Sequence, residues 1–269
     1  MRLRVLLYET PDDPYYNLAF EEAVPRARGC GAVPDTLRIW RNRSAVVIGY
    51  FQRAEEEVNL DEAERRGVAV VRRFTGGGAA YHDLGNINYA VSVASKGPMA
   101  EEVRRAFGEL VRAPVEALRR LGYDASVENV NDIVVAGRKV SGTAATVAWG
   151  STFLHGALLV SASLSTLASV LRVSPKKLLD KGVSSVKYRV TNLSDVRPVG
   201  TAELVEALAS AFAGVLGYEG FYFDVPSPVE LDMASALLRK YRSREWNYER
   251  APHSAYPDVE AEVARICRR

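Results

Sequence analysis

The sequence is poor in cysteine, methionine and glutamine. Among its 269 residues are two cysteines, three methionines and one glutamine, Gln52. Cys30 and Cys267 stand near opposite ends and show no spacing typical of a metal site, so a disulfide framework is not expected. A single long-range bridge between them stays open, because intracellular proteins of hyperthermophiles carry such bonds. Scarcity of thermolabile residues is typical of heat-adapted proteins.

Long apolar runs and a secretory leader are also missing. No apolar run approaches the ~20 residues that a membrane-spanning helix requires. The basic and apolar start of the chain is interrupted at once by Glu9, Asp12 and Asp13, so it is too short for a signal peptide. We therefore expect a cytoplasmic protein that does not bind membranes.

The charge balance is close to neutral. A formal net charge of +2, with arginine pairs scattered along the chain, argues against a dedicated nucleic-acid binder. The hydrophobic fraction of 48% is ample for a buried core, and 25% charged residues is ordinary for a soluble protein. The length fits one large domain, or one domain with a small lobe.

Hairpin-like and helical segments are mixed along the chain. Strands are expected over Leu3–Tyr8, Thr36–Trp40, Ala45–Tyr50, Val68–Arg73, Ile87–Val93, Ile133–Ala136, Lys139–Ala145, Phe153–Val160 and Glu219–Phe223. Helices are expected over Tyr15–Arg28, Asn59–Arg66, Ala100–Leu121 with a kink at Pro114, Leu164–Leu171, Pro175–Asp180, Ala202–Val215 and finally Pro228–Arg242. Arg41 to Ser44 is interpreted as a hairpin-like connection. This order predicts an α+β fold, a mixed β-sheet packed by helices.

The densest chemical pattern surrounds three consecutive glycines, Gly76 to Gly78. Glycines after a strand let backbone N–H groups approach an anion closely, and the preceding Arg72-Arg73 can neutralise phosphate or carboxylate. By itself the run is equally compatible with a plain turn between strands. The polar side chains from His82 to Asn88 favour a site, because so many polar groups before an apolar strand need partners.

A second pattern is Lys139 within a strand of small and apolar residues. Burying a lysine there is costly without an anion, and its compact charge suits a phosphoryl or carboxylate oxygen. The alternative is a snorkelling lysine at a hairpin tip. His155 also stands in a strand, where a lone histidine is more often structural, and the polar stretch Ser184 to Leu193 shows no mechanism by itself.

Taken as an ordered set, these segments resemble the lipoate-protein ligase A family, whose superfamily includes biotin ligases and octanoyltransferases. The matching motifs run nearly the length of the chain: Tyr16 to Ala19 with Glu21-Glu22, Trp40 to Asn42 with Val46 to Gly49, Arg72 to Asn86, Asn131-Asp132 with Gly137 to Gly142, His155 to Leu159, Arg189 to Leu193, and Glu245 to Asn247.

The resemblance implies a single biotin/lipoate ligase-like catalytic domain over residues 1–269 and a two-step reaction. Lipoate and ATP, normally with Mg²⁺, give lipoyl-AMP, and a lysine of a carrier domain then takes the lipoyl group. The carriers would be the acyltransferase subunit of 2-oxoacid dehydrogenases and the glycine-cleavage carrier protein. No protein nucleophile is required, so the chemistry is positioning and electrostatics.

The family's roles fall on matching residues, although they imply no set of metal ligands. Lys139 would be the catalytic residue, between the lipoyl carbonyl and the phosphate. The nucleotide or lipoyl-AMP would be held by Lys139 with Arg73, Gly76, Gly77, Gly78, Ala79, Ala80 and Tyr81. The lipoate pocket would be lined by Trp40, Arg72, His82, Asn86, Asp132 and His155.

One departure from the family's long form concerns the C-terminal accessory domain, which serves the activation step. The chain ends soon after Glu245 to Asn247, as in the short archaeal-type form whose accessory domain is a separate chain. We therefore expect transfer from lipoyl-AMP by the chain alone, and activation of lipoate with a partner. The stretches Pro98–Val103 and Ser174–Val186 are interpreted as lids over the ligand.

Three other functions compete with this prediction. An octanoyltransferase would take its acyl group from acyl-carrier protein without ATP, but relatives of that kind use a cysteine in the core, and Cys30 and Cys267 lie outside every matched motif. A biotin ligase has a different glycine loop. A non-catalytic binder of carriers or nucleotides is not demanded by any residue, since Arg73, the glycines and Lys139 are all present.

Overall fold

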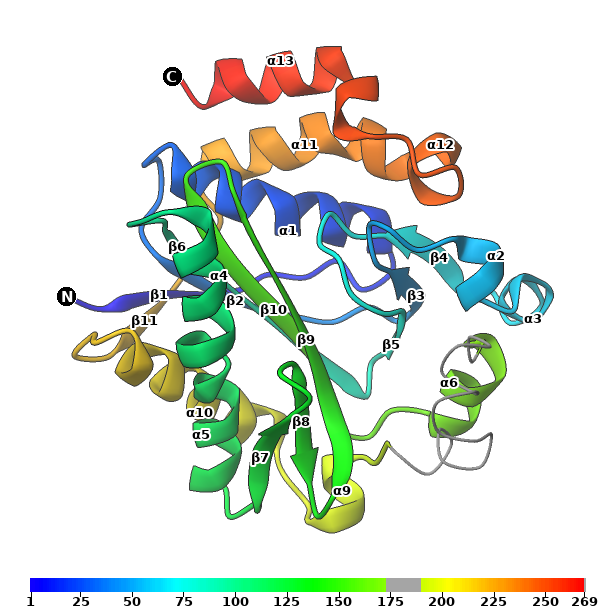
Figure 1. Ribbon diagram of the computed structural model, residues 1–269, viewed down its shortest axis with the longest axis vertical. Helices are drawn as coiled ribbons and strands as arrows, with labels where there is room; N and C mark the ends of the chain where they lie inside the picture. The colour runs from blue at the N-terminus through cyan, green and yellow to red at the C-terminus, as the bar shows by residue number, and fades with distance from the viewer. Residues whose placement is uncertain (173–189, 269) are drawn as a thin grey trace.

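The structure, a computed structural model, describes residues 1–172 and 190–268 (Figure 1). Its strands are β1 Leu3–Leu7, β2 Thr36–Trp40, β3 Ser44–Ile48, β4 Ala69–Arg72, β5 Ala80–Asp83, β6 Asn86–Ala94, β7 Ala125–Glu128, β8 Asp132–Val135, β9 Arg138–Ala148, β10 Ser151–Leu159 and β11 Phe221–Asp224. Its helices are α1 Pro14–Gly29, α2 Ala54–Glu57, α3 Leu60–Arg65, α4 Met99–Arg105, the π-helical turn η1 Ala106–Leu110, α5 Arg112–Arg120, α6 Leu164–Val170, α9 Leu193–Val196, α10 Thr201–Val215, α11 Pro228–Arg242, α12 Arg244–Asn247, the 3₁₀ turn η2 His253–Ala255 and α13 Pro257–Ile266.

Two sheets organise these elements. The larger has the order β11-β1-β2-β6-β10-β9-β8-β7, and the smaller β4-β3-β5. In the large sheet β1 pairs in parallel with β11 and β2, whereas the later pairs from β2 to β7 are antiparallel. The predicted α+β fold with a mixed sheet is therefore confirmed.

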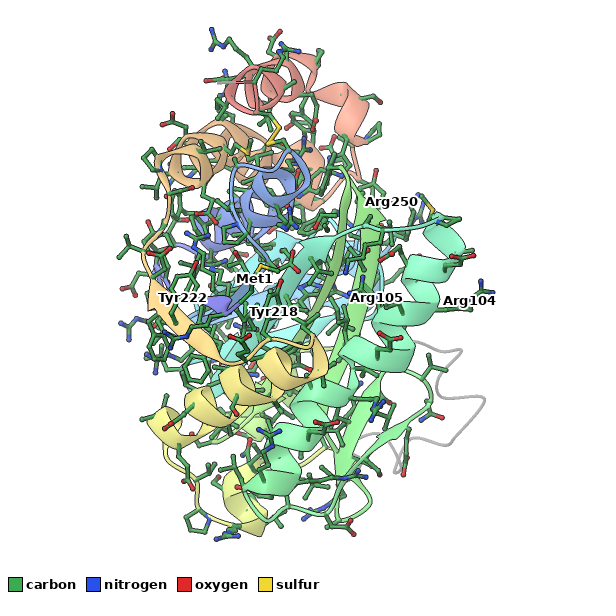
Figure 2. All side chains as sticks on the ribbon, turned by 90° about the vertical axis from the view of Figure 1, so that its left-hand side faces the viewer. Met1, Arg104, Arg105, Tyr218, Tyr222 and Arg250 are labelled. Atoms are coloured by element: carbon green, nitrogen blue, oxygen red, sulfur yellow. A yellow bond between two sulfur atoms is a disulfide. The ribbon has the colours of Figure 1, made fainter. Side chains whose placement is uncertain are left out.

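Helices cover both faces of the large sheet. On one face α5 and α10 pack on apolar side chains of β1, β2, β6 and β10, and these helices face the viewer in Figure 2. On the other face lie α1, α11 and α13, stacked in that order away from the sheet at the top of Figure 1. The small sheet packs beside α1 and has its own apolar cluster with α3 and α6.

A group of buried and half-buried polar side chains, most of them charged, joins the stacked helices; we call Glu22, Arg26, Lys240, Tyr241 and Glu260 the helix-layer charge cluster. The ammonium of Lys240 donates to both oxygens of Glu22 at 2.8 and 2.7 Å, and the Tyr241 hydroxyl donates to Glu22 at 2.6 Å. Arg26 bonds Glu22 at 2.9 Å and holds Glu260 of α13 with two bonds of 2.8 Å. Each charge in this cluster therefore has an opposite partner.

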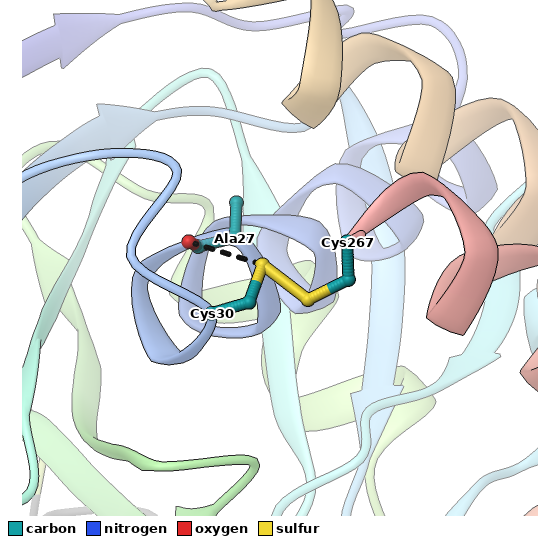
Figure 3. The surroundings of a disulfide bond; sticks show 3 residues. All are labelled: Ala27, Cys30 and Cys267. Atoms are coloured by element: carbon teal, nitrogen blue, oxygen red, sulfur yellow. Dashed lines mark hydrogen bonds between the residues drawn. A yellow bond between two sulfur atoms is a disulfide. The ribbon is translucent and has the colours of Figure 1, made fainter. Parts of the chain in front are cut away.

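A disulfide between Cys30 and Cys267 closes the same layer (Figure 3). It joins the C-terminal cap of α1 to that of α13. The long-range bridge that the sequence left open is thus present, and no free thiol remains among the two cysteines.

Local sequence signals explain several helix ends. Asp13 caps α1 by accepting from the backbone N–H of Tyr16, with Pro14 at the first helical position. Asn59 caps α3 in the same way, as predicted. Among the described residues, no helix is both long and apolar enough to cross a membrane.

Three structural predictions were wrong. Residues 41–44 do not join a hairpin, because β2 lies in the large sheet and β3 in the small one. The long helix breaks at η1 rather than at Pro114, because Pro114 occupies the third position of α5, where its missing N–H needs no partner. Pro98–Val103 is not a lid, since it forms the start of α4, and no residue of it lines the cavity described below.

Other elements were missed or lie elsewhere. The sequence did not predict β5, β7 or the C-terminal helix α13, although Pro257 at its start and acidic residues in its first turn were available signals. The predicted helix Pro175–Asp180 and lid Ser174–Val186 lie outside the described residues.

Candidate active site

A cavity of about 240 Å³ opens beside α1 and both sheets. It brings together ten of the residues predicted to form the site: Trp40, Arg73, Gly78, Ala79, Ala80, Tyr81, His82, Asn86, Lys139 and His155. Its apolar wall, which the sequence did not predict, contains Leu18, Val47, Leu159, Leu167, Leu171 and Val190. Segments far apart in the chain thus converge on one hollow with apolar and polar walls.

A row of paired residues crosses the large sheet under the cavity, and all of its members except Asp132 line the cavity. Across five neighbouring strands the pairs are Asp132 with Gly142, Gly142 with Ala157, Ala157 with Asn88, and Asn88 with Trp40. Directly paired residues point to the same face of a sheet. We call these five residues the floor row. Its second and third members, Gly142 and Ala157, have little or no side chain and therefore leave room above the sheet.

Lys139 stands at the Asp132 end of the floor row. Its Nζ lies 2.5 Å from Oδ1 of Asp132, and a Cβ on Gly142 would lie only 3.0 Å from that Nζ. The register of β8 and β9 shifts between Ile133 and Val134, which turns Lys139 to the same face as Asp132. The ammonium therefore projects over the floor, and Asp132 orients it from outside the cavity wall.

The motif around residues 189–193 supports Lys139 from behind. The backbone N–H of Thr191 donates to the carbonyl of Lys139 at 3.0 Å, and Val190 lines the cavity. The part of this motif up to residue 189 lies outside the described residues.

Arg73 fixes the conformation of the loop that contains Gly76 to Gly78, which we call the glycine loop. Its guanidinium donates to the carbonyls of Val47, Gly76 and Gly78 and to the Thr75 hydroxyl, at distances from 2.6 to 3.2 Å. Burial lowers the pKa of Arg73 to about 10, so the group remains a cation at neutral pH. Its charge is thus built into the cavity wall.

Gly77 and Gly49 permit this arrangement. Gly77 has φ +93, and a Cβ there would lie 2.8 Å from Nη2 of Arg73. A Cβ on Gly49 would lie 2.1 Å from the carbonyl oxygen of Gly77. Any side chain at either position would displace the loop. Gly76 and Gly77 do not line the cavity, so among the three glycines only Gly78 reaches it.

Arg72 faces away from the cavity, which corrects its predicted place in the pocket. Its guanidinium donates to the carbonyls of Gly49, Tyr50, Gln52, Trp246 and Asn247. Burial lowers its pKa to about 10. Arg72 ties the loop after β3 to α12, so its role is structural.

A chain of hydrogen bonds connects α1 to the glycine loop. Nδ1 of His155 lies 3.2 Å from a Glu21 oxygen, and Nε2 lies 2.7 Å from the Thr75 hydroxyl. Arg73 also donates to that hydroxyl oxygen, so Thr75 connects the histidine to the buried guanidinium.

The charge state of Glu21 follows from opposing effects. Burial acts to raise the pKa of its carboxyl, but His155 and the Arg38 guanidinium outweigh burial and hold that pKa below its usual value. Trp40 donates its indole N–H to the other Glu21 oxygen at 3.1 Å. A carboxylate at this depth therefore fixes two cavity-lining side chains, and the sequence had offered Glu21 only as part of a motif.

His82 and Asn86 line the cavity with their polar atoms largely engaged. Burial lowers the pKa of His82 to about 3, so its ring is neutral, and Asn42 bonds its Nδ1 at 3.3 Å. Asn86 closes the turn between β5 and β6 by accepting from the backbone of Asp83 and donating to that of Tyr81. Both side chains therefore shape the cavity wall, and most of their hydrogen-bonding capacity is used within the protein.

One cluster of described residues has ligand atoms close enough together to hold a metal ion, but this cluster does not line the cavity. Glu22, His253 and Glu260 bring ligand atoms within 4.8 Å of one another. Lys240 and Arg26 already neutralise these carboxylates. Two cations in the cluster disfavour a third.

The chain matches a family model described as the lipoyl protein ligase A/B catalytic domain over residues 13–213. The matched range contains the glycine loop, Lys139 and the whole floor row. The chain belongs to this family.

Individual relatives of the family agree with it along nearly their whole length. The chain is 38% identical over 258 residues to lipoate-protein ligase A subunit 1 of Thermoplasma acidophilum, covering 92% of this chain and 97% of the relative. A solved structure from the same organism, of a bipartite lipoate-protein ligase studied with its E2 lipoyl domain, has a TM-score of 0.83, 37% identity and coverage of 94% and 98%. A lipoate-protein ligase A with bound ATP has a TM-score of 0.81, 35% identity and coverage of 93% and 100%.

Proposed function

We propose that this protein is a lipoate-protein ligase that makes lipoyl-AMP from lipoate and ATP and transfers the lipoyl group to a carrier lysine. The observation that carries the proposal is that the Lys139 ammonium projects over the end of the floor row and lines the same cavity as Arg73 and Gly78. An acid lying along the floor presents its carboxylate to that ammonium. The relatives' names and the ATP-bound relative support the same reaction.

In this proposal each step relies on positioned charge. A lipoate oxygen attacks the α-phosphorus of ATP, and pyrophosphate leaves. A lysine amine of the carrier then attacks the acyl carbonyl, AMP leaves, and the amine loses its proton. Lys139 stabilises negative charge on the phosphoryl and carbonyl oxygens in both steps, while Arg73 and the backbone from Gly78 to Tyr81 hold the adenylate. His155, through Thr75, positions that loop.

Mg²⁺ fits the site as an ion that arrives with the nucleotide. Magnesium is usually held by one or two carboxylates together with substrate phosphates. Near Lys139 the described residues offer one such group, Asp132, which already pairs with the Lys139 ammonium, so the nucleotide phosphates would supply most of the ligands. When bound, the ion would neutralise phosphate charge.

Partners follow from the same relatives. We propose a separate accessory chain for activation, since relatives are named as subunit 1 and as a bipartite ligase. The acceptor would be a lipoyl domain of a 2-oxoacid dehydrogenase, and by extension the glycine-cleavage carrier. We also propose a cytoplasmic location.

The structure weakens the cysteine-dependent octanoyltransferase as an alternative. Both cysteines are joined in the disulfide of the helix layer, and neither lines the cavity. Thioester chemistry would therefore lack its nucleophile.

A reconstitution experiment tests the proposal. The purified chain is incubated with a lipoyl carrier domain, with and without the accessory chain, and with lipoate plus ATP, lipoyl-AMP or octanoyl-carrier protein. We expect lipoylation from lipoyl-AMP by the chain alone, and from lipoate plus ATP with the accessory chain. The proposal would be overturned if octanoyl-carrier protein were the only one of the three donors from which the carrier domain is modified.

A further inference from the structure

The side chain of Asn88 stands out among the polar groups of the cavity. It is 2% exposed, and neither its Nδ2 nor its Oδ1 has a hydrogen-bond partner among the described residues. The neighbouring polar groups Glu21, His82, Asn86 and His155 all have partners. Leaving a buried amide unpaired costs free energy, so native proteins avoid it unless a ligand or water completes the bonds.

Asn88 occupies a defined place along the floor row. It lies two strands from Gly142, over which the Lys139 ammonium projects, and next to Trp40. Adjacent strands are ~4.8 Å apart, so Asn88 is about 10 Å from Gly142 along the row. Asn88 therefore lies toward the end of the cavity opposite to the carboxylate position, where Trp40 alone follows it on the floor row.

An eight-carbon acid matches this span. Three chain bonds in an extended chain cover roughly 3.5 Å, so the seven carbon–carbon bonds of such an acid cover roughly 8 Å. With the carboxylate at Lys139, the far end of the acid reaches Asn88. Octanoate carries only methylene and methyl groups there, whereas lipoate carries the two sulfur atoms of its dithiolane ring.

We propose that Asn88 is a specificity residue that selects a sulfur-bearing acyl tail over a plain alkyl tail. This inference rests on the function proposed above. The Asn88 amide N–H donates to a ring sulfur, which is a weak acceptor. If the ring is reduced, a thiol S–H donates instead to Oδ1. An alkyl tail offers the amide nothing and leaves it buried and unpaired.

Ser92 provides a matched control on the same strand and face. Its hydroxyl is also buried without a partner among the described residues, but Ser92 does not line the cavity. Replacing either residue removes an unpaired polar group from the same side of β6. Only the replacement at Asn88 changes what the acyl tail contacts.

The test compares transfer rates from three acyl-adenylates by the intact chain: lipoyl-AMP, octanoyl-AMP and the adenylate of cyclopentylpentanoate, which has the shape of lipoate without sulfur. In Asn88→Val we expect the lipoyl preference over both other donors, measured as the ratio of kcat/KM values, to fall roughly three- to tenfold, the range of one net hydrogen bond. Ser92→Ala should keep the wild-type ratios.

Each outcome decides between the two proposals. A wild-type chain that transfers none of the three acyl groups contradicts the proposed function. If the wild-type chain transfers them and Asn88→Val has the same ratios, the proposed function stands and only the role of Asn88 is contradicted. An ordered water would then complete the hydrogen bonds of the Asn88 amide. If Asn88→Val does not fold, the side-chain amide resonances of wild-type Asn88 decide: they should shift with lipoate and not with cyclopentylpentanoate, and equal shifts overturn the inference.

Discussion

The cavity and the helix-layer charge cluster bury polar groups in opposite ways. In the cluster, Glu22 receives bonds from Lys240, Tyr241 and Arg26, and every charge is matched inside the protein. In the cavity, Asn88 has no partner among the described residues, and Lys139 has one anion, Asp132. Complete pairing in the cluster leaves no capacity for a ligand, whereas incomplete pairing in the cavity reserves it.

The adjacent residues Arg72 and Arg73 differ in another way, because both guanidinium groups are paired inside the protein but only Arg73 lines the cavity. Arg72 and Arg73 are both buried cations, but Arg72 bonds carbonyls of α12 and Arg73 bonds carbonyls of the glycine loop. The contrast predicts that changes in the cavity alter activity with little effect on stability, and that changes in the cluster do the reverse.

The largest effect is expected from Lys139→Ala. Adenylate formation should be abolished, because the charge that stabilises the reacting oxygens is lost, while the thermal midpoint of unfolding should stay near that of the wild type. Release of pyrophosphate with lipoate, ATP and the accessory chain measures the reaction. Arg138→Ala, at the exposed neighbouring position, is the control. Unchanged turnover in Lys139→Ala would refute the proposed role.

The next largest effect should come from Glu22→Gln. Removing this charge leaves Lys240 and Arg26 buried with too little negative charge, and breaking a buried ion pair costs about 3–5 kcal/mol. Denaturant unfolding measures the loss. Transfer from lipoyl-AMP should persist where the variant is folded. A loss of activity without a loss of stability would break the comparison between the two regions.

Loss of the disulfide should have a smaller effect. In Cys30→Ser with Cys267→Ser, we expect the free energy of unfolding to fall by about 2–4 kcal/mol, the usual contribution of such a bond. Acyl transfer at moderate temperature should be unchanged, because neither cysteine lines the cavity. A variant as stable as the oxidised wild type would show that the helix layer does not depend on the bond.

The smallest effect is a dependence of stability on pH. Burial raises the pKa of Glu260, but bonds from His253 and Arg26 prevail and lower it to about 2, against a usual value of 4.5. The pKa of Glu22 is also lowered, since Lys240 and Arg26 outweigh its burial. A lowered carboxyl pKa stabilises the fold above its unfolded value, so this stability should be lost as pH falls from 4.5 toward 2. In Glu260→Gln the free energy of unfolding, measured as a function of pH, should fall less steeply between pH 4.5 and 2 than in the wild type. The same slope in both proteins would contradict this prediction.

The sequence predicted the residues of the site better than their partners. Lys139, Arg73 and the glycines stand in motifs, and the structure brings most of them to one cavity. The wrong placement of Arg72 was avoidable, because consecutive residues of a strand point to opposite faces. The same alternation places Asn88 on the face of Asn86 and could have identified it.

Other features depend on contacts that no local pattern contains. The connection over residues 41–44 has the length of a hairpin turn, yet whether it joins two strands of one sheet is decided by the packing of β3 against β4 and β5. The pairing of Cys30 with Cys267 requires α13 to lie near α1, across a sequence separation of 237. Glu21 became recognisable as a site residue only once His155 and Trp40 lay beside it.

The disulfide also changes the covalent topology of the chain. Residues 30 to 267 form a closed ring, and Arg73, Lys139 and His155 all belong to it. A single peptide-bond cut anywhere in the ring gives two peptide fragments that the disulfide still joins, so the protein is not divided in two. The parts of the active site would therefore stay tethered after such a cut until the bridge is reduced.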